Sequence, residues 1–240
     1  MIALFDMDGT LFPGDSQLRF AAHILSRRPW RRLYLFFLLP FALMTLLRLC
    51  SPALMKRAFL AYLWRMKRTE IEREAELFAE GGLVPVLYPE TLARLKRHQE
   101  RNDLCILVSA SPDFYTEALG RHLGFNAAIA TPFEWGERMP LLPPIVPPGN
   151  NKGANKALRL RASGLVPREG LIPDSVGYTD SRADLPMLAL CGHAVLVNPS
   201  PALEASLGTK AEVLRPELPW KSKWGHLRFI VRCILGLRLH

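Results

Sequence analysis

The stretch Met1-Ile-Ala-Leu-Phe-Asp-Met-Asp-Gly-Thr10 decides the fold, because a short apolar run ends there in two carboxylates one residue apart. An apolar run of this kind is typical of a buried strand in a parallel sheet. Residues two apart in a strand point the same way, and Gly9 lets the chain leave the extended path just after Asp8. Two carboxylates at the tip of a buried strand are costly unless a cation lies between them, and Mg²⁺ is the natural candidate. An acidic loop is the alternative interpretation of this stretch taken alone.

The composition indicates a folded protein with an anionic partner. At 240 residues the chain can form one large domain, or a core with an insertion. Its four cysteines are scattered without a C-x-x-C pair, which favours reduced thiols in a cytoplasmic compartment. The apolar run before Asp6 is too short for a signal peptide, so no cleavable signal is expected. A formal net charge of +9 suggests nucleic acid, a membrane surface or a phosphorylated substrate as the partner.

Residues 13–84 are predicted to form a helical insertion after the first strand. The insertion contains an apolar segment at 33–50, whose uncharged stretch 33–47 has arginines on both sides. Fifteen uncharged residues interrupted by Pro40 fall short of the roughly 20 that span a bilayer. A single crossing would also put two halves of one sheet on opposite sides of the membrane. We expect the segment either to pack as a core helix or, as we prefer, to lie on or dip into an anionic membrane surface.

From residue 85 the sequence alternates between helical and strand patterns. This alternation predicts an α/β fold with a doubly wound parallel sheet, built from residues 1–12 and 85–215. In such sheets, ligands bind at the carboxyl ends of the strands. Side chains that directly follow strands are therefore candidates for one shared site.

Polar residues also occur at the end of a second predicted strand and at the start of a predicted helix. Ser109 follows a predicted strand and precedes a helix whose N–H groups can receive an anion. Lys152 begins the predicted helix 152–162, where the helix dipole disfavours a cation, so an anionic ligand explains this lysine better. Lys156 is the alternative for the same role, and Lys152 is preferred because it lies nearer the predicted helix start.

Two more carboxylates follow the predicted strand 175–178. Asp180 and Asp184 are four residues apart at the start of a predicted helix. They would either cap that helix or join Asp6 and Asp8 around a cation. Together these clusters would bring four carboxylates, a hydroxyl and an ammonium to one edge of the sheet, which suits Mg²⁺ and a phosphoryl group.

In this order, DMDGT, LVSAS, a lysine and GYTDSRAD resemble the four motifs of the haloacid dehalogenase superfamily of phosphatases. The helical insertion after the first motif resembles the C1 cap of the phosphoserine-phosphatase-like branch. The resemblance implies that Asp6 attacks phosphorus and becomes an aspartyl phosphate, while Asp8 acts as general acid and then as general base. It further implies a Mg²⁺ site made by Asp6, the backbone carbonyl of Asp8 and Asp180, phosphoryl binding by Ser109 and Lys152, and supporting roles for Asp184, Gly9 and Thr10.

The cap carries a second resemblance. Arg27-Arg28-Pro29 before a leucine and phenylalanine run, with GYTDSRADLPMLALCGH later, resembles phosphatidylglycerophosphatase C. This resemblance implies a membrane lipid phosphate such as phosphatidylglycerophosphate as substrate, and a peripheral or monotopic position on the cytoplasmic side of the inner (plasma) membrane. The alternative is a soluble, phosphoserine-phosphatase-like enzyme that acts on a small metabolite in the cytoplasm. Nucleic acid is not expected, because the chain shows no zinc-finger spacing and no aromatic-basic RNA motif.

The tail, residues 216–240, is predicted to be a basic amphipathic helix. Its apolar residues would form one broad face with lysine and arginine around it, and no acidic residue follows Glu217. This composition fits a second interfacial anchor on an anionic bilayer. The alternative is a terminal helix that packs on the core.

Overall fold

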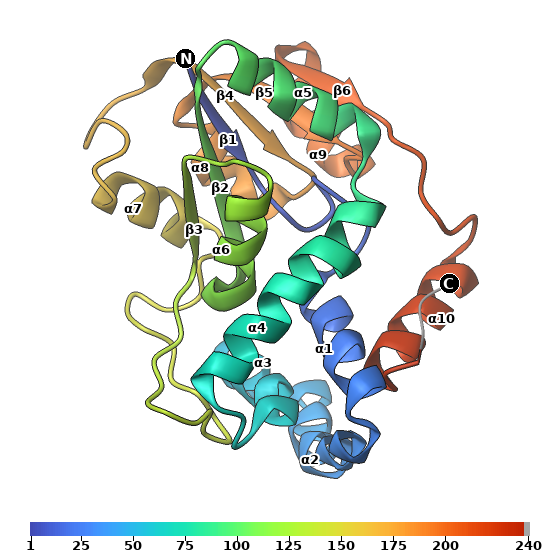
Figure 1. Ribbon diagram of the computed structural model, residues 1–240. Coiled ribbons are helices and arrows are strands. Elements are labelled where there is room, and N and C mark those ends of the chain that lie inside the picture. The colour runs from blue at the N-terminus through green and yellow to red at the C-terminus, as the bar shows by residue number, and fades with distance from the viewer. Residues whose placement is uncertain (238–240) are drawn as a thin grey trace.

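The computed structural model describes residues 1–237 and contains a six-stranded sheet in which neighbouring strands are all parallel. The strand order is β3-β2-β1-β4-β5-β6 (Figure 1). The predicted doubly wound α/β fold is confirmed. The strands are β1 (Ile2–Phe5), β2 (Leu104–Pro112), β3 (Ala127–Thr131), β4 (Ile172–Thr179), β5 (Cys191–Val197) and β6 (Ala211–Leu214).

The first strand lies in the middle of the sheet, between β2 and β4. Ile2 is aligned with Leu104 on one side and with Ser175 on the other. Leu4 and Phe5 are fully buried because helices cover both faces of the sheet, which explains the nearly continuous apolar sequence of β1.

The two faces of the sheet carry different helices. Phe5 and Leu107 pack in the core on the side of α5 and α6, whereas Leu4 and Ile106 pack on the opposite side with Leu160 of α7. This arrangement places the carboxyl ends of β1, β2 and β4 at one edge, where a site can form. The helices are α5 (Pro89–Glu100), α6 (Asp113–His122), α7 (Ala154–Ala162), α8 (Leu185–Leu188) and α9 (Pro201–Leu207).

A helical cap follows β1 and lies at the end of the sheet where the strands finish (Figure 1). An aromatic cluster joins it to the core: the ring of Phe20 lies 5.1 Å from that of Phe78 in the cap and 5.0 Å from that of Tyr115 on α6. The cap helices are α1 (Ser16–Arg27), α2 (Tyr34–Leu46), α3 (Pro52–Phe59) and α4 (Arg68–Phe78), joined by short turns of 3-10 helix at Pro29–Leu33 and Leu60–Leu63.

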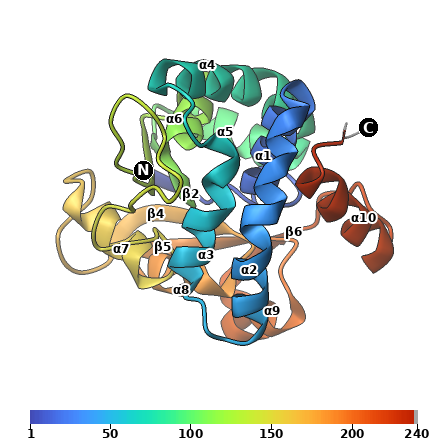
Figure 2. The same ribbon diagram turned by 90° about the horizontal axis from the view of Figure 1, so that it is seen from below.

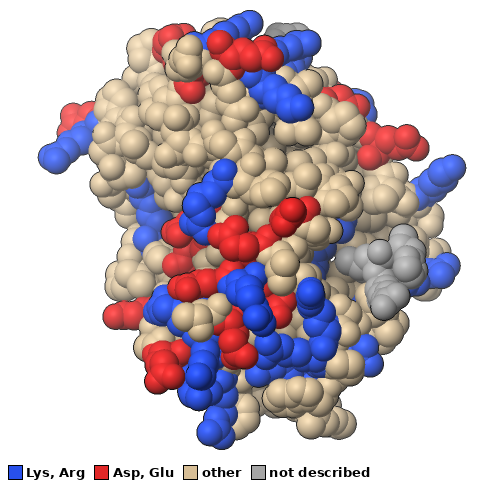
Figure 3. All heavy atoms as spheres, viewed as in Figure 1, with Lys and Arg blue, Asp and Glu red and all other residues tan. Residues whose placement is uncertain are grey.

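The apolar helix α2 is largely uncovered by the rest of the chain. Only Tyr34 and Leu38 in it are buried, whereas Phe36 is 78% exposed and Leu46 is 79% exposed. In Figure 3 the lower end of the molecule, where Figure 1 places α2, is bordered by Lys and Arg but is itself mostly uncharged. No helix in residues 1–237 has both the length and the apolar character that a membrane crossing requires. We call the exposed residues of this region the apolar cap surface: Trp30, Leu33, Phe36, Leu39, Leu43, Leu46, Leu47 and Leu49.

Several arginines next to this surface have structural partners inside the protein. Arg31 is buried and donates hydrogen bonds to the carbonyl oxygens of Tyr62 and Trp64 at 2.7 and 3.0 Å. Arg28 lies 3.8 Å from the Glu74 carboxylate. The positive rim expected from the sequence is therefore partly used to hold the cap together.

The tail helix α10 (Lys223–Ile234) packs beside α1, as Figures 1 and 2 both show. Gly236 approaches Leu25 so closely that an added Cβ would lie 2.2 Å from the Leu25 Cβ. The guanidinium of Arg19 lies 4.7 Å from the ring centre of Phe229, while Trp224 on the outer side is 76% exposed. The tail thus packs on the cap with one face and leaves apolar side chains exposed on the other.

Candidate active site

The predicted acidic residues meet at the carboxyl edge of the sheet. The Asp6 N–H donates to the carbonyl oxygen of Tyr178 at 2.9 Å, so the tips of β1 and β4 stay paired beyond the strands. This pairing places Asp6 and Asp180 side by side at the carboxyl edge of the sheet. Asp6 is buried and Asp180 is half-buried, and loss of solvent raises the pKa of Asp6 to about 6 and that of Asp180 to about 8.

Lys156 lies between two of these carboxylates. Its Nζ is 2.5 Å from Asp6 Oδ1 and 2.8 Å from Asp184 Oδ2, and its side chain is 2% exposed. Burial alone would lower the pKa of the ammonium, but the charges of Asp6 and Asp184 outweigh burial and raise it. A cation held in this way can offset negative charge beside Asp6.

The preference for Lys152 over Lys156 is corrected by this geometry. Helix α7 begins at Ala154, two residues later than predicted, after Gly153 with φ 63°. Lys152 consequently precedes the helix, and its exposed side chain lines an outer cavity. Lys156 occupies the first turn instead and points into the site.

The Asp184 side chain contacts Lys156 and makes no capping hydrogen bond to helix α8. Its Oδ2 accepts a hydrogen bond from Thr179 Oγ1 at 2.7 Å as well as the contact from Lys156. The predicted alternatives for Asp184 were a helix cap and a place in the acidic cluster, and the structure places it in the cluster. Thr179, the last residue of β4, was not singled out from the sequence.

Asp8 is held by two hydrogen bonds from different parts of the chain. Its Oδ1 accepts from the Ser16 N–H at 2.7 Å, and its Oδ2 accepts from Ser111 Oγ at 2.7 Å. Burial, followed by the charge of Asp15, raises the pKa of Asp8 to about 7. A fixed carboxyl group with a pKa near neutrality suits general acid and base chemistry. Sequence analysis missed Ser111, although it belongs to the same LVSAS motif as Ser109.

The remaining predicted residues surround Asp6 and Asp180. Thr10 Oγ1 donates to Asp6 Oδ2 at 3.3 Å. Gly9 has φ 75°, and an added Cβ would lie 2.2 Å from Asp180 Oδ2, so a side chain at this position would displace the carboxylate. Ser109 is buried, and its Oγ accepts the Ser111 N–H at 3.0 Å.

The carboxyl edge of the sheet carries oxygen atoms that could bind a metal ion. Within residues 1–237, no three acidic, histidine or cysteine side chains are grouped as a metal site. The ligands expected from the sequence are only two side chains, the Asp6 and Asp180 carboxylates, together with the backbone carbonyl of Asp8. An all-oxygen donor set next to buried carboxylates with raised pKa values suits a hard cation such as Mg²⁺.

Two cavities reach the Asp8 side chain. One, of about 450 Å³, lies toward the tail and is lined by Asp180, Trp220 and Phe229 among others. The other, of about 510 Å³, opens toward the cap, and we call it the cap-side cavity. Besides Asp8, the cap-side cavity is lined by polar residues (Asp15, Gln17, Lys56, Ser111, Asn150 and Lys152) and by less polar ones (Leu18, Thr45, Cys50, Pro52, Met55, Phe59 and Ala110).

Lys56 brings a cap residue into contact with the core. Its Nζ donates to Asn150 Oδ1 at 2.7 Å and to the carbonyl oxygen of Ala110. Burial lowers the pKa of this lysine to about 8. The sequence contained no signal for this role, because Lys56 lies in a helix with several other basic residues.

Comparisons with known proteins agree with the architecture. The family described as haloacid dehalogenase-like hydrolase matches residues 3–189. Phosphoserine phosphatase SerB1 of Mycobacterium tuberculosis (strain ATCC 25618 / H37Rv) is 26% identical over 211 residues, which cover 85% of this chain and 66% of that protein. Putative hydrolase ML2424 of Mycobacterium leprae is 25% identical over 211 residues, covering 85% of this chain and 68% of that protein. The chain therefore spans about two thirds of the length of these relatives.

Solved structures show the same fold. A protein of unknown function from Bordetella pertussis Tohama I has a TM-score of 0.71 at 25% identity, with 89% of this chain and 97% of that chain covered. A substrate-bound phosphoserine phosphatase has a TM-score of 0.58 at 15% identity, with 96% of each chain covered, and its likeness concerns the fold alone. With the family match over most of its length, this chain belongs to the haloacid dehalogenase-like hydrolase family.

Proposed function

We propose that this enzyme hydrolyses phosphomonoesters with Mg²⁺ through an aspartyl phosphate on Asp6. The observation that carries the proposal is the position of Lys156, buried between Asp6 and Asp184 at the carboxyl edge of the sheet. A carboxylate can attack an anionic phosphoryl group only where nearby positive charge offsets their repulsion. Lys156 supplies one such charge directly at the Asp6 side chain.

The residues that would hold Mg²⁺ are Asp6, Asp180 and the backbone carbonyl of Asp8. A bound divalent cation would supply further positive charge against the phosphoryl oxygens. Gly9 supports this assignment, because its lack of a side chain leaves room for the Asp180 carboxylate. The phosphoryl oxygens would meet Lys156 and the hydroxyl of Ser109.

The proposed reaction has two steps at Asp6. In the first step, a carboxylate oxygen of Asp6 forms a bond to phosphorus while the bond from phosphorus to the leaving oxygen breaks. Asp8 gives its proton to that oxygen, so the product leaves as an alcohol. In the second step, water attacks the phosphorus of the aspartyl phosphate and gives a proton to Asp8, which releases phosphate and restores Asp6. The hydrogen bonds from Ser16 and Ser111 keep Asp8 in place for both transfers.

A small soluble phosphomonoester is one candidate substrate. Its support is the relationship to Phosphoserine phosphatase SerB1 and the shared fold with phosphoserine phosphatases. Two ammonium groups in the cap-side cavity, those of Lys56 and Lys152, would suit a leaving group that carries a carboxylate or a second phosphate. In this case the enzyme would act in the cytoplasm.

A lipid-linked phosphomonoester, such as phosphatidylglycerophosphate, is the second candidate. The observation in its favour is that Thr45 and Cys50 line the cap-side cavity, while their neighbours Leu46 and Leu49 are 79% and 69% exposed. A phosphate at Asp6 and an apolar tail at the apolar cap surface would then belong to one molecule. The enzyme would bind the anionic cytoplasmic face of the membrane peripherally.

A phosphate-release assay on soluble phosphomonoesters and on lipid phosphates in vesicles tests the proposal and separates the two substrates. Replacement of Leu46 by Glu should lower release from vesicles and spare a soluble substrate if the substrate is lipid-linked. Leu171→Glu is the matched control, because Leu171 is an exposed leucine outside the cap. Release from soluble substrates alone favours the first candidate, and no Mg²⁺-dependent release from any phosphomonoester would refute the proposed function.

A further inference from the structure

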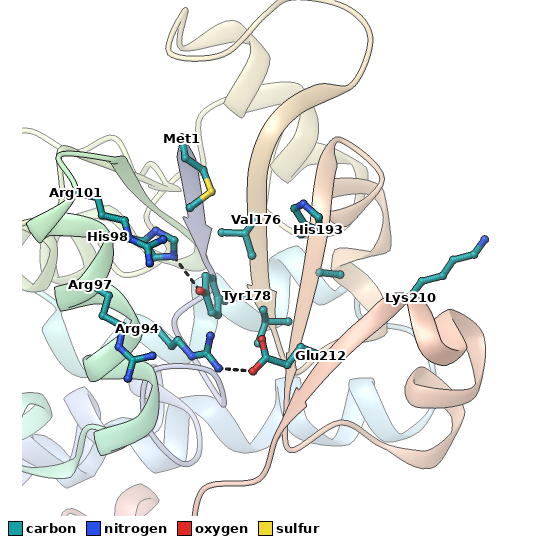
Figure 4. A pocket seen from close by; sticks show the side chains of 12 residues that line it. Met1, Arg94, Arg97, His98, Arg101, Val176, Tyr178, His193, Lys210 and Glu212 are labelled. Atoms are coloured by element: carbon teal, nitrogen blue, oxygen red, sulfur yellow. Dashed lines mark hydrogen bonds and ion pairs between the residues drawn. The ribbon is translucent and has the colours of Figure 1, made fainter.

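A separate cavity of about 310 Å³ lies between α5 and the sheet (Figure 4). We call it the α5 pocket. None of the residues assigned above to catalysis, metal or phosphate binding lines it. Its lining residues are Met1, Arg94, Arg97, His98, Arg101, Val176, Tyr178, His193, Ala194, Val195, Lys210 and Glu212.

The wall and the floor of the α5 pocket differ in chemistry. Arg94, Arg97 and Arg101 are spaced three and four residues apart on α5 and just after it, so they follow one side of the helix, as Figure 4 shows. The floor is formed by the sheet, where Val176 and Val195 are buried and apolar. A ligand in this pocket would meet guanidinium groups on one side and apolar side chains beneath.

Positive charge in the α5 pocket is mostly unbalanced. Glu212 is the single acidic residue of the lining, and it pairs with Arg94. In the described part of the chain, no carboxylate pairs with Arg97, Arg101 or Lys210, whose side chains are exposed.

Helix electrostatics explains only part of this arrangement. The end of a helix favours positive charge, which accounts for Arg97 and Arg101 near the end of α5. Lys210 comes from the turn before β6, and Figure 4 shows its side chain pointing away from the arginines of α5. Arg97 and Arg101 are four residues apart on the same side of α5, where like charges repel one another unless an anion lies between them.

The floor of the pocket is held in place by a buried hydrogen-bond chain. His98 Nδ1 lies 2.7 Å from Asp103 Oδ2, and His98 Nε2 lies 2.9 Å from the hydroxyl of Tyr178. The Tyr178 ring also stacks on Phe5, with the ring planes 2° apart and the centres 4.1 Å apart. A site with a fixed floor loses little entropy when a ligand binds.

We propose that the α5 pocket binds a small polyanion of the class of phosphorylated metabolites. Arg97 and Arg101 pair with its phosphate groups, and the apolar part of the ligand rests on Val176 and Val195. A volume of about 310 Å³ admits a small molecule rather than a macromolecular chain. The site is independent of the catalytic edge, so this proposal does not depend on the proposed phosphatase reaction.

Calorimetric titration with pyrophosphate in the presence of EDTA tests the α5 pocket. Without a divalent cation, the catalytic carboxylates repel an anion, so binding there is suppressed. The pocket variant is Arg97→Gln/Arg101→Gln. The control is Arg73→Gln/Arg168→Gln, which removes the same charge from exposed positions outside the pocket.

We expect the wild-type protein and the control variant to bind pyrophosphate with similar affinity, and the pocket variant to bind about tenfold more weakly or worse. Added salt should weaken binding to the wild-type protein. Circular dichroism melts establish that each variant is folded. Equal affinity of the pocket and control variants would overturn the proposal, as would failure of the wild-type protein to bind at millimolar pyrophosphate.

Discussion

The Nζ atom of Lys156 lies 2.5 Å from Oδ1 of Asp6, and this pair is buried in the centre of the site. Asp184 contacts the same ammonium from the other side. One cation therefore lies between two buried carboxylates, one of them the proposed nucleophile. Removal of Lys156 would leave two buried carboxylates without their cation in a place with little solvent.

Asp6→Asn should abolish turnover of phosphomonoesters. The amide keeps the size of the side chain but cannot attack phosphorus, and loss of a nucleophile commonly costs at least about a thousandfold in kcat. Steady-state kinetics with a soluble phosphomonoester measures the loss. Asp174→Asn serves as the control, because this carboxylate is 81% exposed and lies outside the site. Activity near the wild-type level in a folded Asp6→Asn protein would contradict the assigned nucleophile.

Exchange of the two candidate lysines for glutamine should give unequal results. Lys156→Gln removes the charge between Asp6 and Asp184, so we expect kcat to fall by about a hundredfold or more. Lys152→Gln removes an exposed ammonium from the cap-side cavity, so a change of less than about tenfold, mainly in KM, is expected. A larger loss of kcat in the Lys152 variant would restore the assignment preferred from the sequence.

Asp180→Asn should mainly weaken the dependence on Mg²⁺. A neutral amide is a poorer ligand for a hard cation than a carboxylate, so activity should require a higher Mg²⁺ concentration. Titration of activity against Mg²⁺ measures the shift, and saturating metal should recover part of the rate. The Lys156→Gln protein provides the comparison, because excess Mg²⁺ does not replace its missing ammonium. Equal Mg²⁺ dependence of wild-type and Asp180→Asn proteins would remove Asp180 from the metal site.

The effect of Mg²⁺ on thermal stability should increase with pH. Burial raises the pKa of Asp8 to about 7 and of Asp180 to about 8, above the ordinary value of 3.8. The stabilisation from these protonated groups is complete below about pH 4 and is lost as pH rises through 7 and 8. Mg²⁺ binds the ionised carboxylates, so the rise in Tm on adding Mg²⁺ should be larger near pH 8 than near pH 5.5. Melting curves in EDTA and in Mg²⁺ at both pH values give the rise in Tm that Mg²⁺ causes. A larger rise near pH 5.5 than near pH 8 would contradict the prediction.

Two aromatic residues of α10 should have separable effects. Phe229→Ala removes the ring that contacts Arg19 and lines the cavity toward Asp180, so we expect Tm to fall by roughly 5 °C. Trp224→Ala should leave Tm nearly unchanged, because Trp224 is 76% exposed. If the tail is an interfacial anchor, the Trp224 variant should bind anionic vesicles less well in a sedimentation assay. Unchanged vesicle binding by the Trp224→Ala protein would contradict the interfacial anchor, and the role of the tail would then be to pack on the cap.

The parts of the site that could be predicted from the sequence are those fixed by strands. Asp6 and Asp180 follow apolar strands, and parallel strands bring their carboxyl ends together whatever the details of packing. Lys156 was ranked below Lys152 because the predicted helix began two residues early, and a shift of this size turns a different side chain toward the site. Lys56 was missed because it reaches the core from the cap, and the orientation of a cap is set by tertiary contacts rather than by local pattern.

The position of β1 also has a consequence for synthesis of the chain. β1 leaves the ribosome before its neighbours in the sheet, β2 and β4, which begin only at Leu104 and Ile172. The nascent chain therefore emerges with the apolar helix α2 already made and with no sheet to support the cap. Pairings between such distant segments are slow, and an exposed apolar helix invites aggregation in the meantime. The proposed nucleophile is thus synthesised long before β4, and its site is assembled only after β4 has emerged.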